Sequence, residues 1–172
     1  SEAFVKRNYY IVNAEKDNFQ HLTGVHSKIS AQEFFDKCLD GSLSGLDFDF
    51  IKKGQDEKSV KGTVRRKIRA LPEMMELFRE GLQAEEGFKK NKVVCSFAAA
   101  DSNCTLGFTD SAKARPKSLI WGNELKKPKP ADLVLKRKAG AELFDEVVVG
   151  SREALNHYRE QIEGIVDKVL LQ

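Results

Sequence analysis

The sequence is poor in the residues that build disulfide frameworks and metal centres. Its 172 residues include three cysteines, Cys38, Cys95 and Cys104, and only three histidines. The cysteines are odd in number and none belongs to a CxxC pair, so neither a disulfide framework nor a zinc site is expected. We interpret them as buried or half-buried free thiols of a reducing compartment, and expect a cytoplasmic protein.

Long apolar runs and nucleotide-binding motifs are also missing. The longest apolar runs, such as 147–149 and 169–171, fall far short of the ~20 residues that a membrane-spanning helix needs, so no membrane partner is expected. No signal peptide is expected either, because no apolar segment follows the basic residues near the start. The chain has no Gly-rich phosphate loop, no GxGxxG, no HExxH, no GxSxG and no dense carboxylate cluster. P-loop hydrolysis, dinucleotide redox chemistry and metalloproteolysis are therefore disfavoured, and we expect no metal and no cofactor.

The length and hydrophobic content fit a single domain spanning residues 1–172. Domains most often have ~100–150 residues and split beyond about 250. Hydrophobic residues make up 41% of the chain, which is enough for a core.

The first half of the chain has the patterns of one strand and several helices. β-branched and aromatic residues predict a strand at 5–12. Residues 19–25 are typical of an irregular turn or a single helical turn, and 44–51 fit either a short helix or a strand. Ser30 and Glu33 form a capping-box pattern before a helix that Gly41 ends. A further helix is expected from about 60 to 71, with Val60, Val64, Ile68 and Leu71 on its apolar stripe. Pro72 ends or kinks it and can open another helix that contains Met75, Phe78 and Leu82 and whose end Gly81 and Gly87 mark.

Beyond Gly87 the apolar period changes to two. Strand-length segments follow at 92–98, 104–109, 118–121, 133–138 and 143–149. The loops between them are too short for crossover helices, so an antiparallel meander is expected. Ser151 is expected to cap a last helix. The predicted class is α+β, with an N-terminal strand and helices, a meander sheet and a C-terminal helix.

Positive charge is concentrated in two segments. The net charge is only +3, yet residues 52–69 carry a local +6, residues 113–138 a local +7, and the rest sums to −10. If the fold brings the two segments together, they form a surface for a polyanion. If it does not, they are ordinary solvated surface.

Two segments carry candidate chemistry. His21 lies beside Thr23 in the first, and histidine is the side chain best suited to proton transfer near neutral pH. Arg115, Lys117 and Ser118 lie in the second; a guanidinium can grip a phosphate with two donors, and nearby cations and hydroxyls can share its charge. Together they provide parts for metal-free RNA cleavage. Each alone also fits a structural histidine and a solvated basic cluster.

The same segments resemble a known family. The stretch from Tyr9 to Val12, followed by Asn-Phe-Gln-His-Leu-Thr-Gly at 18–24, is similar to the opening of the phage-associated barnase–EndoU–colicin–RelE-like nucleases. The segments 31–44, 63–68, 115–119 and 136–138 are similar to later helices and strands of that group. The resemblance covers most of the chain, and its most specific part is the His-Leu-x-Gly turn.

The resemblance implies a compact α+β fold and a metal-independent ribonuclease or related toxin activity. It assigns His21 as general acid/base, Arg115 as phosphate clamp, and Thr23 and Ser118 as hydrogen-bonding partners. RNA is the expected substrate, with DNA as the alternative, and an immunity or antitoxin protein is a candidate partner. The residues expected to bind nucleic acid are basic: Lys113, Lys117, Arg65, Arg66, Arg69, Lys136 and Lys138. Two other functions stay open, a non-catalytic nucleic-acid-binding module and a phage protein that inhibits a host protein.

Overall fold

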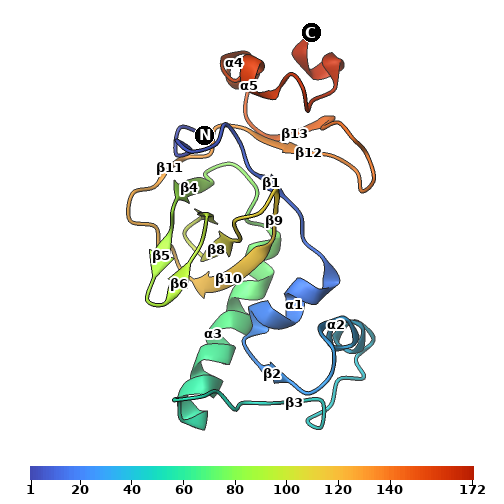
Figure 1. The fold of residues 1–172 in the computed structure, drawn as a ribbon, viewed down its shortest axis with the longest axis vertical. Helices are drawn as coiled ribbons and strands as arrows, with labels where there is room; N and C mark the ends of the chain where they lie inside the picture. Colours follow the sequence, from blue (N-terminus) through green and yellow to red (C-terminus); the bar gives the residue numbers. More distant parts are fainter.

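The computed structural model describes residues 1–172 and confirms the α+β class (Figure 1). Its helices are α1 (Lys16–Thr23), α2 (Ala31–Asp40), α3 (Glu57–Met75), α4 (Arg152–His157), α5 (Arg159–Ile162) and a 3₁₀ helix at Lys168–Leu171. No helix is both long and apolar enough to span a bilayer.

The main sheet has five strands in the order β10-β8-β7-β4-β11. Their bounds are β4 (Gln83–Glu86), β7 (Phe97–Ala100), β8 (Cys104–Phe108), β10 (Pro116–Trp121) and β11 (Lys129–Pro130). All four pairings are antiparallel, as the loop lengths predict.

The remaining strands form four short pairs. Three are antiparallel: β2 (His26–Ser27) with β3 (Phe48–Asp49), β5 (Lys89–Lys90) with β6 (Val93–Val94), and β12 (Val134–Lys136) with β13 (Glu146–Val149). The fourth, β1 (Ile11–Val12) with β9 (Lys113–Ala114), is parallel. The predicted N-terminal strand is therefore only two residues long, and the last two predicted strands pair with each other outside the main sheet.

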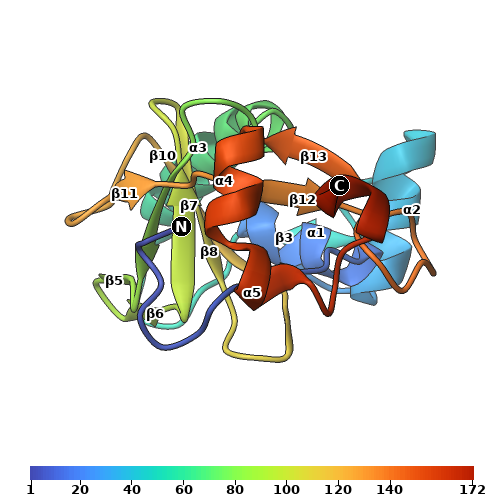
Figure 2. The ribbon, with the colours of Figure 1, turned by 90° about the horizontal axis from the view of Figure 1, so that it is seen from above.

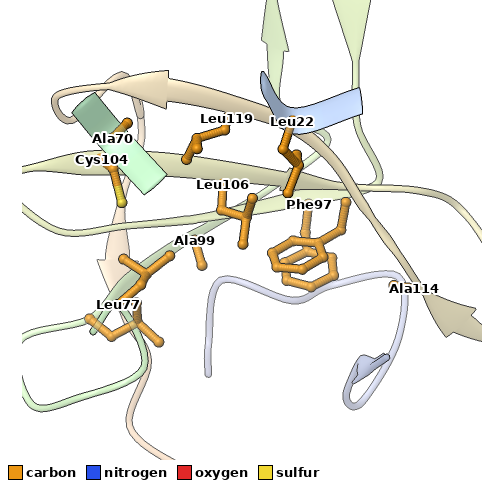
Figure 3. Packing of buried hydrophobic residues seen from close by; sticks show 11 residues of the cluster. Leu22, Ala70, Leu77, Phe97, Ala99, Cys104, Leu106, Ala114 and Leu119 are labelled. Carbon is orange, nitrogen blue, oxygen red and sulfur yellow. The ribbon is translucent and has the colours of Figure 1, made fainter. Parts of the chain in front are cut away.

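The largest hydrophobic cluster lies between the sheet and the helices (Figure 3). Leu22 from α1, Ala70 from α3 and Leu119 from β10 belong to it, together with the stacked rings of Phe97 and Phe108. This packing holds α1 against β10 and α3. It thereby fixes the segment that carries His21 relative to the strand that follows Arg115.

Helix α1 is longer than the predicted turn. The Glu15 backbone N–H donates to Asn18 Oδ1 at 2.9 Å, which caps the first turn, and Gly24 ends the helix with φ +78°. The apolar pattern of this polar helix is weak, and burial of Leu22 in the main core stabilises it. Tertiary contact thus supplies what the local sequence signal lacks.

Helix α3 corrects two expectations. It runs through Pro72 to Met75 as one helix, and no helix opens there; the segment 83–86, expected to be helical, is β4. Ile68, expected on the buried stripe, is 52% exposed. The inward positions of the helix are instead 60, 64, 67 and 70, so that Lys67 lies between the buried residues Val64 and Ala70.

The C-terminal unit, residues 133–171, packs around its own hydrophobic cluster and lies at the end of the molecule's long axis opposite the start of α3 (Figures 1 and 2). Ser151 caps α4, as predicted, by accepting from the Ala154 N–H at 3.3 Å. The expected single helix breaks at Tyr158, whose hydroxyl donates to Asp132 at 2.8 Å. Beyond α5 the chain forms a bridge between Phe144 and Val166 instead of continuing as a helix.

Candidate active site and nucleic-acid interface

The side chain of Arg115 contacts the first turn of α1. Its Nε donates to Asn18 Oδ1 at 3.4 Å, and its Nη2 forms ion pairs with Glu15, at 3.3 Å, and with Asp17. Nη1 makes no hydrogen bond. Arg115 therefore keeps one end of its guanidinium free to meet a phosphate oxygen.

His21 lies one helical turn beyond Asn18 on α1. Residues three apart on a helix are neighbours on its surface, with about 5–6 Å between their Cβ atoms. The imidazole is exposed, and neither ring nitrogen makes a hydrogen bond. The exposed imidazole therefore follows, one turn along the same helix, the asparagine that contacts the Arg115 guanidinium.

Lys67 reaches the other end of the same helix from α3. A Cβ added to Gly24 would lie 2.7 Å from Lys67 Cδ and 3.3 Å from Cε, so the lysine stem lies directly over this glycine. Gly24 is one turn beyond His21, and its backbone N–H donates to the His21 carbonyl at 3.3 Å. The row Asn18, His21, Gly24 therefore has Arg115 at one end and Lys67 at the other.

Lys67 has no carboxylate partner and no side-chain hydrogen bond. Burial lowers the pKa of its ammonium, and the positive charge of Lys52 lowers it further. A cation that is desolvated but unpaired is expensive in a structure, and such groups gather at functional sites. Sequence reasoning missed it, although one signal was present: position 67 continues the apolar stripe of Val60 and Val64.

Thr23 and Ser118 are not positioned to contact a phosphate beside His21. The Thr23 side chain is buried; its Oγ1 donates to the Gln20 carbonyl at 2.7 Å and accepts from the Val25 N–H at 3.3 Å. It therefore closes the turn after α1. Ser118 pairs with Gly107, whose missing Cβ would point at Cys95, so its side chain faces away from α1.

A second histidine has an orienting carboxylate. His26 on β2 lies with Nδ1 at 2.9 Å from Asp49 Oδ1 on β3, and more than half of its side chain is exposed. The Ile51 backbone N–H and, to a smaller extent, His26 lower the pKa of Asp49. A carboxylate-bound imidazole is a recognised form of general base, so His26 competes with His21 for that role.

The predicted nucleic-acid-binding residues are exposed and mostly without acidic partners. Only Lys136 forms an ion pair, with Glu146 at 3.2 Å. Arg69 lies over the ring of Trp121 at 5.6 Å, which brings the two basic segments together where α3 crosses β10. Lys117 instead donates to the Val94 carbonyl at 2.8 Å, on the same side as Cys95. The residues without an ion pair are Lys113, Lys117, Arg65, Arg66, Arg69 and Lys138.

No group of three or more His, Cys, Asp or Glu side chains is arranged to hold a metal ion.

One family model matches the chain, over residues 4–118, about two thirds of its length. Its description is phage-Barnase-EndoU-ColicinE5/D-RelE like nuclease4. The match includes His21, Lys67 and Arg115 and ends within β10. No curated protein and no solved structure matches the chain.

Proposed function

Because the chain belongs to the phage-Barnase-EndoU-ColicinE5/D-RelE like nuclease family, we propose that it is a metal-independent endoribonuclease. It acts as a toxin-like effector of phage or mobile-element origin and cleaves RNA through the 2′-hydroxyl. The observation that carries this proposal is the row on α1, in which Asn18 contacts the Arg115 guanidinium, His21 is exposed, and Gly24 lies under the stem of the unpaired Lys67.

The reaction needs one base, one acid and a site for the negative charge at phosphorus. His21 accepts the proton of the 2′-hydroxyl, and the 2′-oxygen forms a bond to phosphorus as the bond from phosphorus to the 5′-oxygen breaks. Lys67 donates a proton to the leaving 5′-oxygen, which its lowered pKa favours. The products are a 2′,3′-cyclic phosphate and a 5′-hydroxyl.

Arg115 stabilises the non-bridging oxygens through its free Nη1, while Nε and Nη2 hold the guanidinium against α1. Fixed donors of this kind favour the transition state because they need no reorganisation as the charge develops. Thr23 keeps the turn closed and so positions Gly24 and Lys67. Ser118 has no part in this mechanism because its side chain lies on the face of the sheet that points away from α1.

The exposed cations hold the RNA backbone. Arg65, Arg69 and Lys113 have no acidic partner, so a phosphate does not have to displace one. Binding of this type weakens steeply with added salt. An antitoxin or immunity protein that covers the row on α1 would inhibit the enzyme, and acidic side chains would suit this partner.

The test is incubation of the purified protein with total RNA and with single-stranded DNA in EDTA. The wild type is expected to cleave RNA, and His21→Ala to lose that activity. His157→Ala is the matched control, because this exposed histidine lies on α4. Variant His26→Ala separates the two candidate bases. If wild type and His21→Ala cleave RNA equally and His26→Ala does not cleave it, the general base is His26, oriented by Asp49.

A non-catalytic nucleic-acid-binding module is the second candidate, favoured by the number of unpaired cations. It predicts salt-sensitive RNA binding without cleavage, unchanged in His21→Ala.

A further inference from the structure

A cavity of about 620 Å³ lies between the main sheet and the C-terminal unit. Its walls come from the N-terminal segment, the sheet, and the strands and helices beyond residue 130. Ligand sites in proteins typically have volumes of about 300–1,000 Å³. The cavity is therefore large enough for a nucleotide, and half of its wall lies outside the segment that the family model matches.

The cavity has one sign of charge. Four basic residues line it, Lys113, Lys136, Arg137 and Lys138, and none of the lining residues is Asp or Glu, although the chain has 26 acidic residues. Lys113 and Lys138 form no ion pair. Most of the other lining residues are apolar. This combination suits a ligand with an apolar or aromatic body and an anionic group.

Aromatic rings provide a stacking surface. Tyr9 lines the cavity, is partly exposed, and makes neither a hydrogen bond nor a ring contact. Phe144 also lines the cavity, and the guanidinium carbon of Arg137 lies 4.8 Å from the centroid of its ring. An unused ring and a cation beside an aromatic ring are the elements with which proteins stack bases of single-stranded nucleic acid.

The edge of the cavity adjoins the row on α1. Asn13 lines the cavity and donates through Nδ2 to Glu15 at 3.0 Å, and Glu15 pairs with Arg115 at 3.3 Å. The Asn13 backbone N–H donates to the Ala114 carbonyl, which joins this edge to β9 and Lys113. Two side-chain contacts thus separate the cavity from the proposed phosphate clamp.

We propose that the cavity binds a nucleobase of the RNA next to the cleaved phosphate, so that the C-terminal unit sets the nucleotide preference. Tyr9 stacks on the base, and Lys113 and Lys138 contact the adjoining phosphate. This inference rests on the proposed function for its substrate class. The inference goes beyond that function because it assigns a site that determines nucleotide specificity.

The test measures binding of the four nucleoside 5′-monophosphates to the full chain by calorimetry at low salt. One nucleotide is expected to bind tighter than the others. Tyr9→Ala should weaken its binding roughly tenfold, the order of effect that loss of one stacked base has, while Tyr9→Phe retains it. Lys138→Gln should weaken it several-fold. Lys168→Gln, an exposed and unpaired lysine of the same unit outside the cavity, should not change it.

Two results overturn the inference. One is equal binding of all four nucleotides by wild type and Tyr9→Ala; the other is tight binding of a fatty acid that no nucleotide displaces. RNA cleavage is measured in parallel to separate the two proposals. Nucleotide binding without RNA cleavage would refute the proposed ribonuclease activity and leave the proposed nucleobase site standing. RNA cleavage with an unchanged base preference in Tyr9→Ala would refute the nucleobase site alone.

Discussion

Arg115 and Asn18 are 97 residues apart in the chain, and Arg115 Nε lies 3.4 Å from Asn18 Oδ1. Two carboxylates of the same helix turn, Glu15 and Asp17, reinforce this contact. The guanidinium that precedes β10 is thereby held against Asn18, which lies one helical turn before His21 on α1. This contact is the structural basis of the proposed active site.

Arg115→Lys keeps the positive charge and removes the planar set of donors. A lysine carries its three donors on one nitrogen and lacks the planar fork that holds α1 with Nε and Nη2 while Nη1 faces a phosphate, so kcat is expected to fall roughly 10²-fold, as for loss of one transition-state donor. The free energy of unfolding should change by less than about 1 kcal/mol, because both ion pairs are partly exposed. Steady-state kinetics check the expected fall in kcat, and a urea titration checks the expected change in the free energy of unfolding. Wild-type kcat in this variant would contradict the clamp.

Lys67→Gln tests the proposed acid. The lysine is charged below its pKa and neutral above it, so activity should fall as pH rises through that value. Because burial and Lys52 lower the pKa, this fall begins below the usual range of lysine near pH 10.4. The variant is expected to lose the alkaline limb of the pH–rate profile along with most of its rate. An unchanged alkaline limb in Lys67→Gln would show that Lys67 is not the general acid.

Gly24→Ala tests the contact between Lys67 and α1. Gly24 has φ +78°, and a Cβ there would collide with Lys67 Cδ at 2.7 Å. We expect the free energy of unfolding to fall by about 1–2 kcal/mol from the backbone conformation, and the rate to fall because Lys67 moves.

Gly41→Ala is the matched control for this substitution. Gly41 ends α2 with nearly the same φ, +76°, and has no atom within 4 Å of an added Cβ. It should lose similar stability and retain its activity. Equal rate losses in both variants would show that strain, and not the position of Lys67, is responsible.

Asp47→Asn tests the support of α2. Asp47 is buried and accepts from Lys37 Nζ and the Ser44 N–H, both at 2.8 Å, and these contacts lower the pKa of its carboxyl. A carboxyl with a depressed folded-state pKa stabilises the fold above its unfolded-state value, ~3.9, and loses this effect as pH falls through the folded-state pKa.

The urea midpoints of wild type and Asp47→Asn should therefore differ most at pH 7 and converge as the pH falls below ~3.9 and through the folded-state pKa of Asp47. Asp145→Asn, at an exposed carboxyl without a side-chain hydrogen bond, should match the wild type at both pH values. A difference between wild type and Asp47→Asn that stays constant with pH would contradict this account.

Local chemistry determined how much of the structure could be predicted. The helix capped by Ser30 was predicted because its cap and its ending glycine lie within a few residues of each other. The strands 104–108 and 116–121 follow from period-two patterns. Helix α1 was underestimated because its stability comes from Leu22, which packs against residues about 50 to 100 positions away.

The candidate site was predicted only in part. His21 and Arg115 were identified as residue types, and the fold brings their segments together, while their catalytic roles stay predictions. Lys67 was overlooked because a lysine on an apolar stripe looks like an interruption of the pattern. The side of the sheet on which Ser118 lies depends on an irregularity in the β8–β10 register between Pro116 and Ser118, which the sequence does not reveal.

The proposed reaction requires the 2′-hydroxyl as its nucleophile. The direct measurement maps the cleaved bond in a short RNA, then replaces that one nucleotide by its 2′-deoxy analogue, in EDTA. A 2′,3′-cyclic phosphate and a 5′-hydroxyl are expected from the RNA, with no cleavage at the deoxy position. Undiminished cleavage at that position would contradict it.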